Sequence, residues 1–132
     1  QNKVDHFGRG FGSRELPWSI NTEYGIESGK ILGLRDYMFS IAMENNNIDY
    51  AFCEKTTDCF ATGTIPIFWG GKKITEFFDE RGIIFLDDLD SIGDLNKELY
   101  YSKIEYVKNN LDLLKKLITS EDYIYLNYLK GR

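Results

Sequence analysis

The sequence predicts an α/β domain with a mainly parallel sheet. Three short apolar segments, residues 37–44, 65–69 and 83–86, are bounded by polar residues or glycines, as buried strands are. Segments with helical periodicity lie between and after them, and this alternation is typical of parallel strands joined by helices. The length of 132 residues suits one domain, so we expect residues 1–132 to form a single folding unit.

Composition narrows the class of protein. The chain is 42% hydrophobic and 28% charged, which is ordinary for a soluble globular domain. A net charge of −5 argues against a nucleic-acid partner. No apolar run approaches the roughly 20 residues that cross a bilayer, so we expect no membrane span.

The chain start and the cysteines bear on cellular context. The sequence begins with Gln1 and has no signal-peptide pattern, so we expect a piece of a longer protein. Cys53 and Cys59 lack the spacing of a zinc site, and free thiols fit a reducing compartment. We therefore expect a cytoplasmic location, with the full-length protein able to sit peripherally on a membrane.

The first third of the chain predicts two strands separated by a long loop. Residues 3–7 read as a strand that feeds a glycine-rich turn at 8–12. Residues 13–29 are polar and irregular, which predicts a loop with one turn of helix. The apolar strand 37–44 then ends at three consecutive asparagines, since asparagine favours turns.

The middle of the chain alternates between helix and strand. Residues 54–61 have a helical pattern that stops at the Thr-Gly-Thr of 62–64. The strand 65–69 follows and closes at Gly70-Gly71, and Pro66 near its start is tolerable. Residues 74–78 predict a short helix, and 83–86 the third strand.

The last third is helical. Residues 95–101 and 102–118 predict two helices, and 120–129 a final one with acidic residues in its first turn. The longest helix carries an amphipathic stripe that consists of Ile104, Val107, Leu111, Leu114 and Ile118.

This topology predicts where a ligand would bind. Parallel sheets bind ligands outside the carboxyl ends of their strands. Three loops should therefore share one rim: those after Phe7, after Glu44 and after Trp69.

The first rim loop offers a phosphate contact. The glycine turn is not the dinucleotide fingerprint, because Ser13 stands where the third glycine should be. Arg9, between Gly8 and Gly10, can bond a phosphate in bidentate fashion. The alternative is a turn with a solvent-exposed arginine.

The second rim loop leads into a helix that begins with Glu54-Lys55. A helix N-terminus favours anions, and a lysine there strengthens the site. A carboxylate beside it suits two sugar hydroxyls. Together with Arg9, this pair indicates a site for a diphosphate attached to a ribose. The alternative is a glutamate that only complements the helix dipole, beside a solvated lysine.

Aromatic residues at the rim can stack on a base or sugar. Phe68 lies inside an apolar strand and is read as core, whereas Trp69 at the strand end fits a binding role, as does Tyr50. Lys72-Lys73 and the acidic run 87–94 are interpreted as solvated faces, without the acidic triplet that holds a nucleotide-sugar metal.

From Lys3 to Asp90 the chain resembles glycosyltransferase family 10, the α-1,3/1,4-fucosyltransferases. The order and spacing of several motifs carry the resemblance: Val4-Asp5, Phe7-Gly8-Arg9-Gly10, residues 37–45, Asp49-Tyr50, Glu54-Lys55 and residues 62–70. The remaining residues are similar to the family's helical tail only loosely.

The resemblance implies a fold and a donor. It implies a GT-B enzyme with two Rossmann-like halves, of which this chain is the C-terminal, three-layered half that binds GDP-fucose. The residues that it implies for the donor site are Arg9 and Lys55 at the diphosphate, Glu54 at the ribose, Asn45 and Tyr50 along the nucleotide and fucose pocket, and Glu44, Trp69 and Gly70 at the pocket wall.

The resemblance also implies the chemistry. Such enzymes are similar to inverting transferases that need no metal or other cofactor, because cationic side chains stabilise the departing GDP. The base that activates the glycan acceptor belongs to the other half, so no catalytic residue is expected in this chain. The face that meets that half would be exposed here and can pair two copies as a homodimer.

One departure from the family pattern leaves alternatives open. The family places a tyrosine three residues before the glutamate of the Glu-Lys pair, but Ala51 fills that place and Tyr50 lies one residue earlier. The alternatives are a GT-B domain for another nucleotide sugar and a non-catalytic Rossmann-like binding module.

Overall fold

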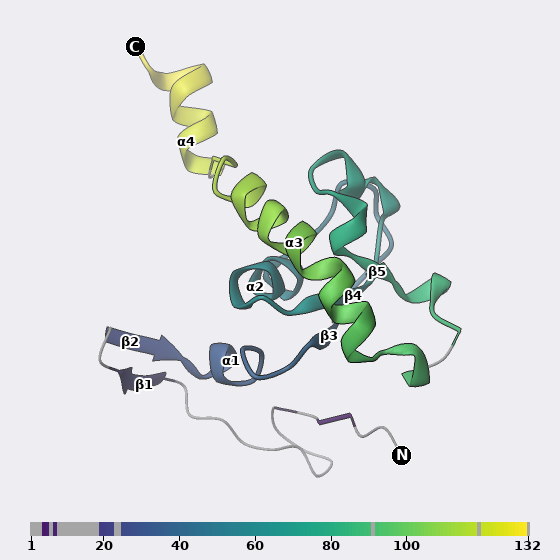
Figure 1. Cartoon of the computed structure of the whole chain (residues 1–132). Coiled ribbons are helices and arrows are strands. Elements are labelled where there is room, and N and C mark those ends of the chain that lie inside the picture. The colour runs from purple at the N-terminus through teal and green to yellow at the C-terminus, as the bar shows by residue number, and fades with distance from the viewer. Residues whose placement is uncertain are drawn as a thin grey trace.

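Three parallel strands form the centre of the structure, a computed structural model, in the order β3-β4-β5 (Figure 1). They are β3 (Phe39–Met43), β4 (Ile65–Trp69) and β5 (Ile84–Phe85). The residues that the structure describes are Val4, Asp5, Phe7, 19–22, 25–90, 92–118 and 120–131. The α/β fold with a parallel sheet is confirmed, and its strands are shorter than expected at 37–44 and 83–86.

The register of the sheet places the ends of β3 and β4 side by side. Phe39 pairs with Ile65 at the start of the two strands, and Met43 pairs with Trp69 at their end. The β4 residues from 65 to 68 are all buried, as expected of the central strand. Because the strands are parallel and in step, the loops that leave them emerge at one edge.

Helix α2 (Glu54–Thr62) connects β3 to β4 and buries Thr56, Cys59 and Phe60. It ends where Gly63 takes a left-handed conformation, with φ of 72°. The hydrophobic core joins this helix to the sheet and to the segments around β5; its buried members are Phe60, Ile65, Ile67, Phe68, Ile74, Phe78, Ile83, Ile84 and Val107. The predicted helix at 54–61 is confirmed.

The connection from β4 to β5 is built of two 3₁₀ helices, η1 (Lys72–Glu76) and η2 (Glu80–Gly82). The short helix predicted at 74–78 is thus shifted toward the N-terminus. Two further 3₁₀ turns, η3 (Leu86–Asp88) and η4 (Ile92–Asp94), lead to the long helix α3 (Lys97–Leu114). Asn110 of α3 is fully buried, and its side chain bonds both the backbone N–H and the carbonyl of Asp79.

One predicted break is wrong, since α3 runs without interruption past residues 101 and 102. Asn96 caps it by accepting the N–H of Leu99 at 2.9 Å. Ser102 stays in the helix because its hydroxyl donates to the carbonyl of Leu99 at 2.7 Å. Of the predicted stripe, Val107 is fully buried, whereas Ile118 lies beyond the helix and is exposed.

The loop predicted at 13–29 is also wrong in part. Strands β1 (Ser19–Thr22) and β2 (Gly25–Ser28) form an antiparallel pair, followed by the short helix α1 (Gly29–Leu32). The pair lies beyond α1 and apart from the parallel sheet (Figure 1). The strand predicted at 3–7 is described only at Val4, Asp5 and Phe7, and its phenylalanine forms a β-bridge.

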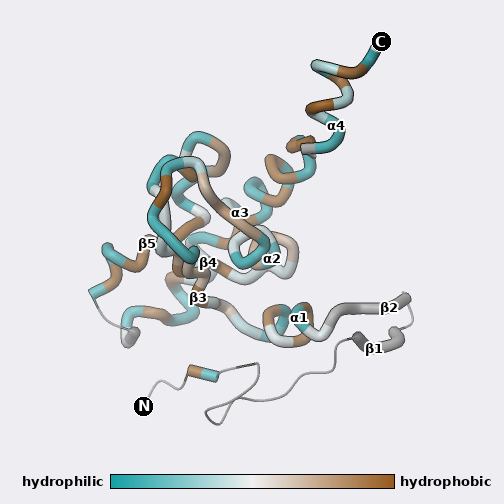
Figure 2. Tube along the Cα trace, turned by 180° about the vertical axis from the view of Figure 1, so that it is seen from behind, coloured by the Kyte–Doolittle hydropathy of each residue, from teal (hydrophilic) through white to brown (hydrophobic). Residues whose placement is uncertain are grey.

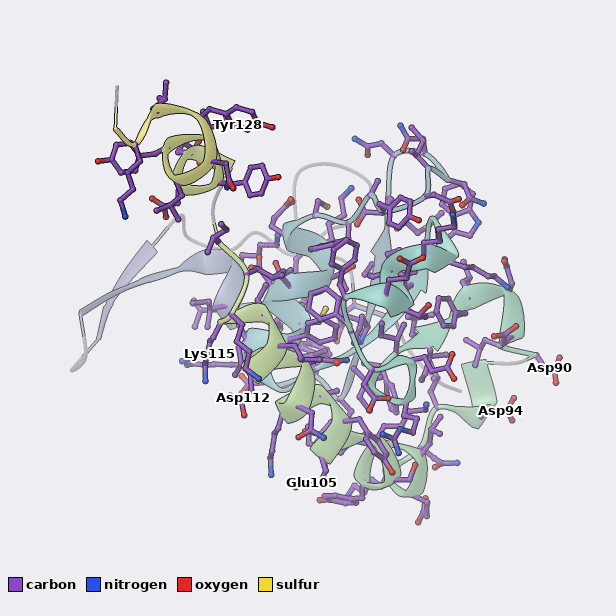
Figure 3. All side chains as sticks on the ribbon, turned by 90° about the horizontal axis from the view of Figure 1, so that it is seen from above. Asp90, Asp94, Glu105, Asp112, Lys115 and Tyr128 are labelled. Atoms are coloured by element: carbon purple, nitrogen blue, oxygen red, sulfur yellow. The ribbon has the colours of Figure 1, made fainter. Side chains whose placement is uncertain are left out.

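The C-terminal helix stands away from the body. It comprises α4 (Ser120–Ile124) and the π-helical turn η5 (Tyr125–Leu129), which matches the prediction for 120–129. Hydrophobic and hydrophilic residues follow one another along it (Figure 2), and Tyr128 lies apart from the side chains of the sheet region (Figure 3). Within the described residues, no helix has the length and apolar character needed to cross a membrane.

Strand β3 is only partly buried, contrary to the expectation of a buried strand. Ala42 is fully enclosed, but Ile41 is 52% and Met43 46% exposed. Among the described strands, β3 takes an outer position in the parallel sheet, so the helices cover it incompletely.

Candidate functional site

The candidate site lies at the carboxyl ends of β3 and β4, where the rim was predicted. The backbone N–H of Glu44 bonds the carbonyl of Trp69 at 2.9 Å, so the residue after β3 is fastened to the end of β4. Gly70 follows directly, and a Cβ on it would stand 3.0 Å from Cγ of Glu44. The three residues predicted for the pocket wall are therefore neighbours.

The carboxylate of Glu44 closes the loop between β3 and α2. Its Oε1 accepts the backbone N–H of Cys53 at 3.0 Å, which ties the first residue after β3 to the residue before α2. Burial, followed by the contact with Glu44, raises the pKa of the Cys53 thiol to about 11. Glu44 thus fixes the shape of the rim, a role that the sequence did not reveal.

The same loop rests on the second glycine after β4. A Cβ on Gly71 would stand 2.1 Å from the carbonyl oxygen of Ile48 and 2.8 Å from Cα of Asp49. Both of these are backbone atoms, which cannot turn aside as a side chain can. The close approach of two loops therefore requires glycine at position 71.

Asn45 and Lys55 are brought together across the loop. Nζ of Lys55 donates to Oδ1 of Asn45 at 3.2 Å. Lys55 lies in the first turn of α2, where the positive end of the helix dipole adds to its own charge. Asn45 is exposed at the rim. The pair makes a cationic corner with an amide beside it, and its role in binding an anion stays a prediction.

Glu54 lies next to this corner with its carboxylate exposed. Hydrogen bonds from the Cys53 thiol and from its own backbone, together with the charge of Lys30, lower the pKa of Glu54 from its usual 4.5. Nζ of Lys30 lies 3.5 Å from Glu54 and 2.8 Å from Asp58. Glu54 is therefore an ionised acceptor held by a lysine of α1, and no pattern in the sequence pointed to that lysine.

Tyr50 projects from the loop with an unusual backbone. Its φ of 64° makes it the single non-glycine residue with positive φ within the described ranges. Its hydroxyl accepts Nζ of Lys73 at 3.1 Å, and that nitrogen also lies 4.8 Å from the centre of the ring. Asp49 pairs with Lys73 at 3.5 Å. Lys73 is exposed, as expected of a solvated face, and its ammonium group contacts Tyr50 and Asp49 at the rim.

Arg9 and the glycine turn 8–12 lie outside the described residues. Phe7 packs edge-on against Tyr37 at 5.6 Å between ring centres, and the Tyr37 hydroxyl donates to Asp5 at 2.9 Å. Tyr37 comes two residues before β3 begins. The predicted position of Arg9 on the rim stays a prediction.

A cavity of about 550 Å³ lies elsewhere, along β5 and the start of α3, and it is lined by none of the predicted donor-site residues that the structure describes. Lys103 donates to the carbonyls of Arg81 and Ile83 there, at 2.9 and 3.4 Å. Burial lowers the pKa of Lys103. Because this lysine covers carbonyls next to an edge strand, we interpret it as protection of the sheet edge.

The family model described as glycosyltransferase family 10 (fucosyltransferase), C-terminal part, matches residues 1–129. The chain belongs to glycosyltransferase family 10. The motifs between Lys3 and Asp90 had indicated this family, and the match extends through nearly all of the helical tail.

One relative of this family 10 chain is alpha-(1,3)-fucosyltransferase B of Drosophila melanogaster. The two are 29% identical over 141 aligned residues, which cover 92% of this chain and 32% of the relative. The chain thus spans about a third of the length of that relative.

Two solved structures are also similar to this chain. A crystal structure of α1,3-fucosyltransferase with GDP-fucose is 25% identical, with a TM-score of 0.43, over 68% of this chain and 27% of that one. A second crystal structure of α1,3-fucosyltransferase is 24% identical, with the same TM-score, over 73% of this chain and 28% of that one.

Proposed function

We propose that this domain binds the donor GDP-fucose, and that the protein to which it belongs transfers fucose to a glycan acceptor. The observation that carries the proposal is the bond between Lys55 and Asn45 at the N-terminus of α2, in a chain that belongs to family 10. The geometry supports an anion site at the rim, and the family supports fucose as the sugar.

The diphosphate fits the first turn of α2. A helix N-terminus directs positive potential outward, and Lys55 adds a full charge at the same place. The amide of Asn45 steadies that lysine from the facing loop. Arg9 would supply a second, bidentate contact, which makes the proposed site cationic on two sides.

The ribose fits the carboxylate of Glu54. Two ribose hydroxyls can donate to its two oxygens, because the low pKa keeps the group ionised at neutral pH. Glu54 would then exchange its 3.5 Å contact with Lys30 for those hydroxyls. Lys30 keeps its shorter contact with Asp58 at 2.8 Å, so the exchange leaves no lysine unpaired.

The reaction that we propose is a single displacement with inversion. The acceptor oxygen bonds to the anomeric carbon of fucose, and the bond to GDP breaks with its electron pair passing to the diphosphate. The proton of the acceptor hydroxyl goes to a carboxylate base outside this domain. Lys55 and Arg9 stabilise the charge on the departing diphosphate, so no metal is required in this proposal.

Isothermal titration of the chain with GDP and GDP-fucose, with and without Mg²⁺, tests the proposal. The decisive variants are Lys55→Met and Arg9→Ala, and the control is Lys108→Met, a lysine of α3 that pairs only with Glu105 at 2.6 Å within the described contacts. We expect binding without Mg²⁺ that falls at least about tenfold in both decisive variants and is unchanged in the control.

The same titration separates the rival functions. Tighter binding of GDP-mannose or of a UDP-sugar would indicate a domain for another nucleotide sugar. A non-catalytic module would be indicated if the folded wild-type chain bound nucleotide weakly or not at all. The Arg9→Ala variant would then give the same titration as the wild type.

A further inference from the structure

Tyr50 has a left-handed backbone conformation, which is rare for a residue other than glycine. A φ of 64° lies in the left-handed region, which is unfavourable for a residue with a side chain. Such a conformation persists only where the surroundings determine it. The turn closed by the N–H of Ala51 on the carbonyl of Ile48 at 3.2 Å is one such restraint, and contacts of the Tyr50 side chain add others.

Two groups from η1 and the residue after it restrain the Tyr50 ring. Phe77 packs against it edge-on, with 6.3 Å between ring centres and planes at 86°. Phe77 in turn contacts Phe52 at 5.4 Å, and Phe52 contacts the buried Phe78 at 5.1 Å. The ring is thus the outer end of an aromatic series that reaches the core.

Lys73 supplies the second restraint, which is a charged one. Its Nζ lies 3.1 Å from the hydroxyl and 4.8 Å from the ring centre. The bond to Tyr50, followed by the charge of Asp49, raises the pKa of Lys73, so the lysine is charged at neutral pH. Cation and ring therefore attract each other at neutral pH.

The neighbouring lysine shows that this contact is specific. Lys72 points to the other side, with Nζ 3.9 Å from Asp87 and 5.8 Å from the centre of the Phe85 ring. Both lysines are exposed and carry the same charge, but only Lys73 contacts the loop of Asn45 and Tyr50. Lys72 is thus a matched control for charge.

We propose that Lys73 is a positioning residue that holds Tyr50 as the aromatic wall of the donor site. The inference rests on the proposed function, since it needs a donor at this rim. Tyr50 is 48% exposed, which leaves ring surface for a ligand. Ala51 has no ring and Phe52 is half-buried against Phe77 and Phe78, so Tyr50 supplies the exposed aromatic surface between β3 and α2.

A thermodynamic cycle on the free protein tests the contact. Lys73→Met should lower the urea midpoint of the wild-type chain more than that of Tyr50→Gly, because in the glycine variant only the pair with Asp49 is left to lose. Lys72→Met should have the same small effect in both backgrounds. Equal effects of Lys73→Met in both backgrounds would overturn the inference, whatever the chain binds.

Titration with GDP-fucose tests the role. Lys73→Met should weaken binding about twofold to fivefold, the size of an exposed cation–π contact. Lys73→Arg should restore binding, since arginine also lies over aromatic rings, and Lys72→Met should bind like wild type. In the Tyr50→Gly background, Lys73→Met should cause no further loss.

The outcomes distinguish this inference from the proposed function. Loss of binding in Lys55→Met with no change in Lys73→Met would sustain the donor site and overturn the role of Lys73. If adding Lys73→Met to Tyr50→Gly weakened donor binding further, the lysine would contact the donor itself. That result would also overturn the role of Lys73 as a positioning residue. A wild-type chain that binds no donor would refute both.

Discussion

Asn45 and Lys55 join the end of β3 to the first turn of α2 through a hydrogen bond of 3.2 Å from Nζ to Oδ1. The bond restrains a long, exposed amide and a flexible lysine before any ligand arrives. Preorganisation of this kind lowers the entropy lost on binding.

Asn45→Asp should separate positioning from charge. The aspartate still accepts the bond from Lys55, but it places a negative charge beside the proposed diphosphate. We expect GDP binding to weaken about tenfold or more by titration, and Asn45→Ala to cost about fivefold. Asn46→Ala, at the exposed neighbouring position, is the control. Undiminished binding by Asn45→Asp would mean that no anion lies at this corner.

Gly71→Ala should displace the rim loop that contains Ile48 and Asp49. The added Cβ meets the carbonyl oxygen of Ile48 at 2.1 Å, so the loop must move. We expect a loss of about 1–3 kcal/mol in the free energy of unfolding, the usual range for overpacking. Urea denaturation measures it, with Lys72→Ala at the next position as control. A variant as stable as wild type would show that the loop does not rest on Gly71.

Asn110→Ala should cost far more stability than Asn109→Ala. Asn110 accepts the N–H of Asp79 at 2.7 Å and donates to its carbonyl at 3.0 Å, whereas Asn109 is exposed. Truncation leaves the N–H of Asp79 without this partner, whereas its carbonyl keeps the N–H of Gly82 at 3.0 Å, so we expect a cost of about 1–3 kcal/mol. Denaturation of the two variants side by side measures the difference, and similar stabilities would contradict the buried contact.

The two thiols should resist alkylation at neutral pH. Both are free, and burial raises the pKa of Cys59 to about 12 and that of Cys53 to about 11. Only the thiolate reacts, so folded protein should react with iodoacetamide far more slowly at pH 8 than unfolded protein. Because the raised pKa means that the folded protein holds the thiol proton more tightly, it favours folding at pH values below the ordinary pKa of 9.0. This contribution is lost as the pH rises through the pKa of the folded state.

Mass spectrometry of the alkylated chain, with Cys53→Ser to isolate Cys59, checks this prediction. Rapid modification of Cys59 in the folded chain at pH 8 would show that its site opens readily, because its side chain is fully buried in the structure.

The parts of the fold that follow from local pattern were predictable. Residues 65–69 form a strand as expected, because a central parallel strand is apolar throughout and bounded by glycine and polar residues. The hairpin β1–β2 escaped prediction, since residues 19–28 lack an apolar alternation. The predicted division between residues 101 and 102 is absent, and the Ser102 hydroxyl bonds within the preceding turn of a continuous helix.

In the candidate site too, some features were predictable from the sequence and others were not. Parallel topology and the sequence order of the loops predicted that Asn45, Glu54 and Trp69 would share an edge. The partners of those residues were not predictable, because Lys30 reaches Glu54 across 24 positions and Lys73 reaches Tyr50 across 23. Contacts between separate loops depend on how the chain packs, and no local spacing records them.

The close contact of Ile48 and Asp49 with Gly71 limits how the length of this loop can vary. A loop that touches the backbone beneath it, and whose two ends are tied by Glu44 and Cys53, has a fixed number of residues. An insertion or deletion in the loop would disrupt either its contact with Gly71 or the hydrogen bond between Glu44 and Cys53. Attempts to alter the proposed donor site should therefore exchange side chains at positions 45 and 50 and keep the loop length unchanged.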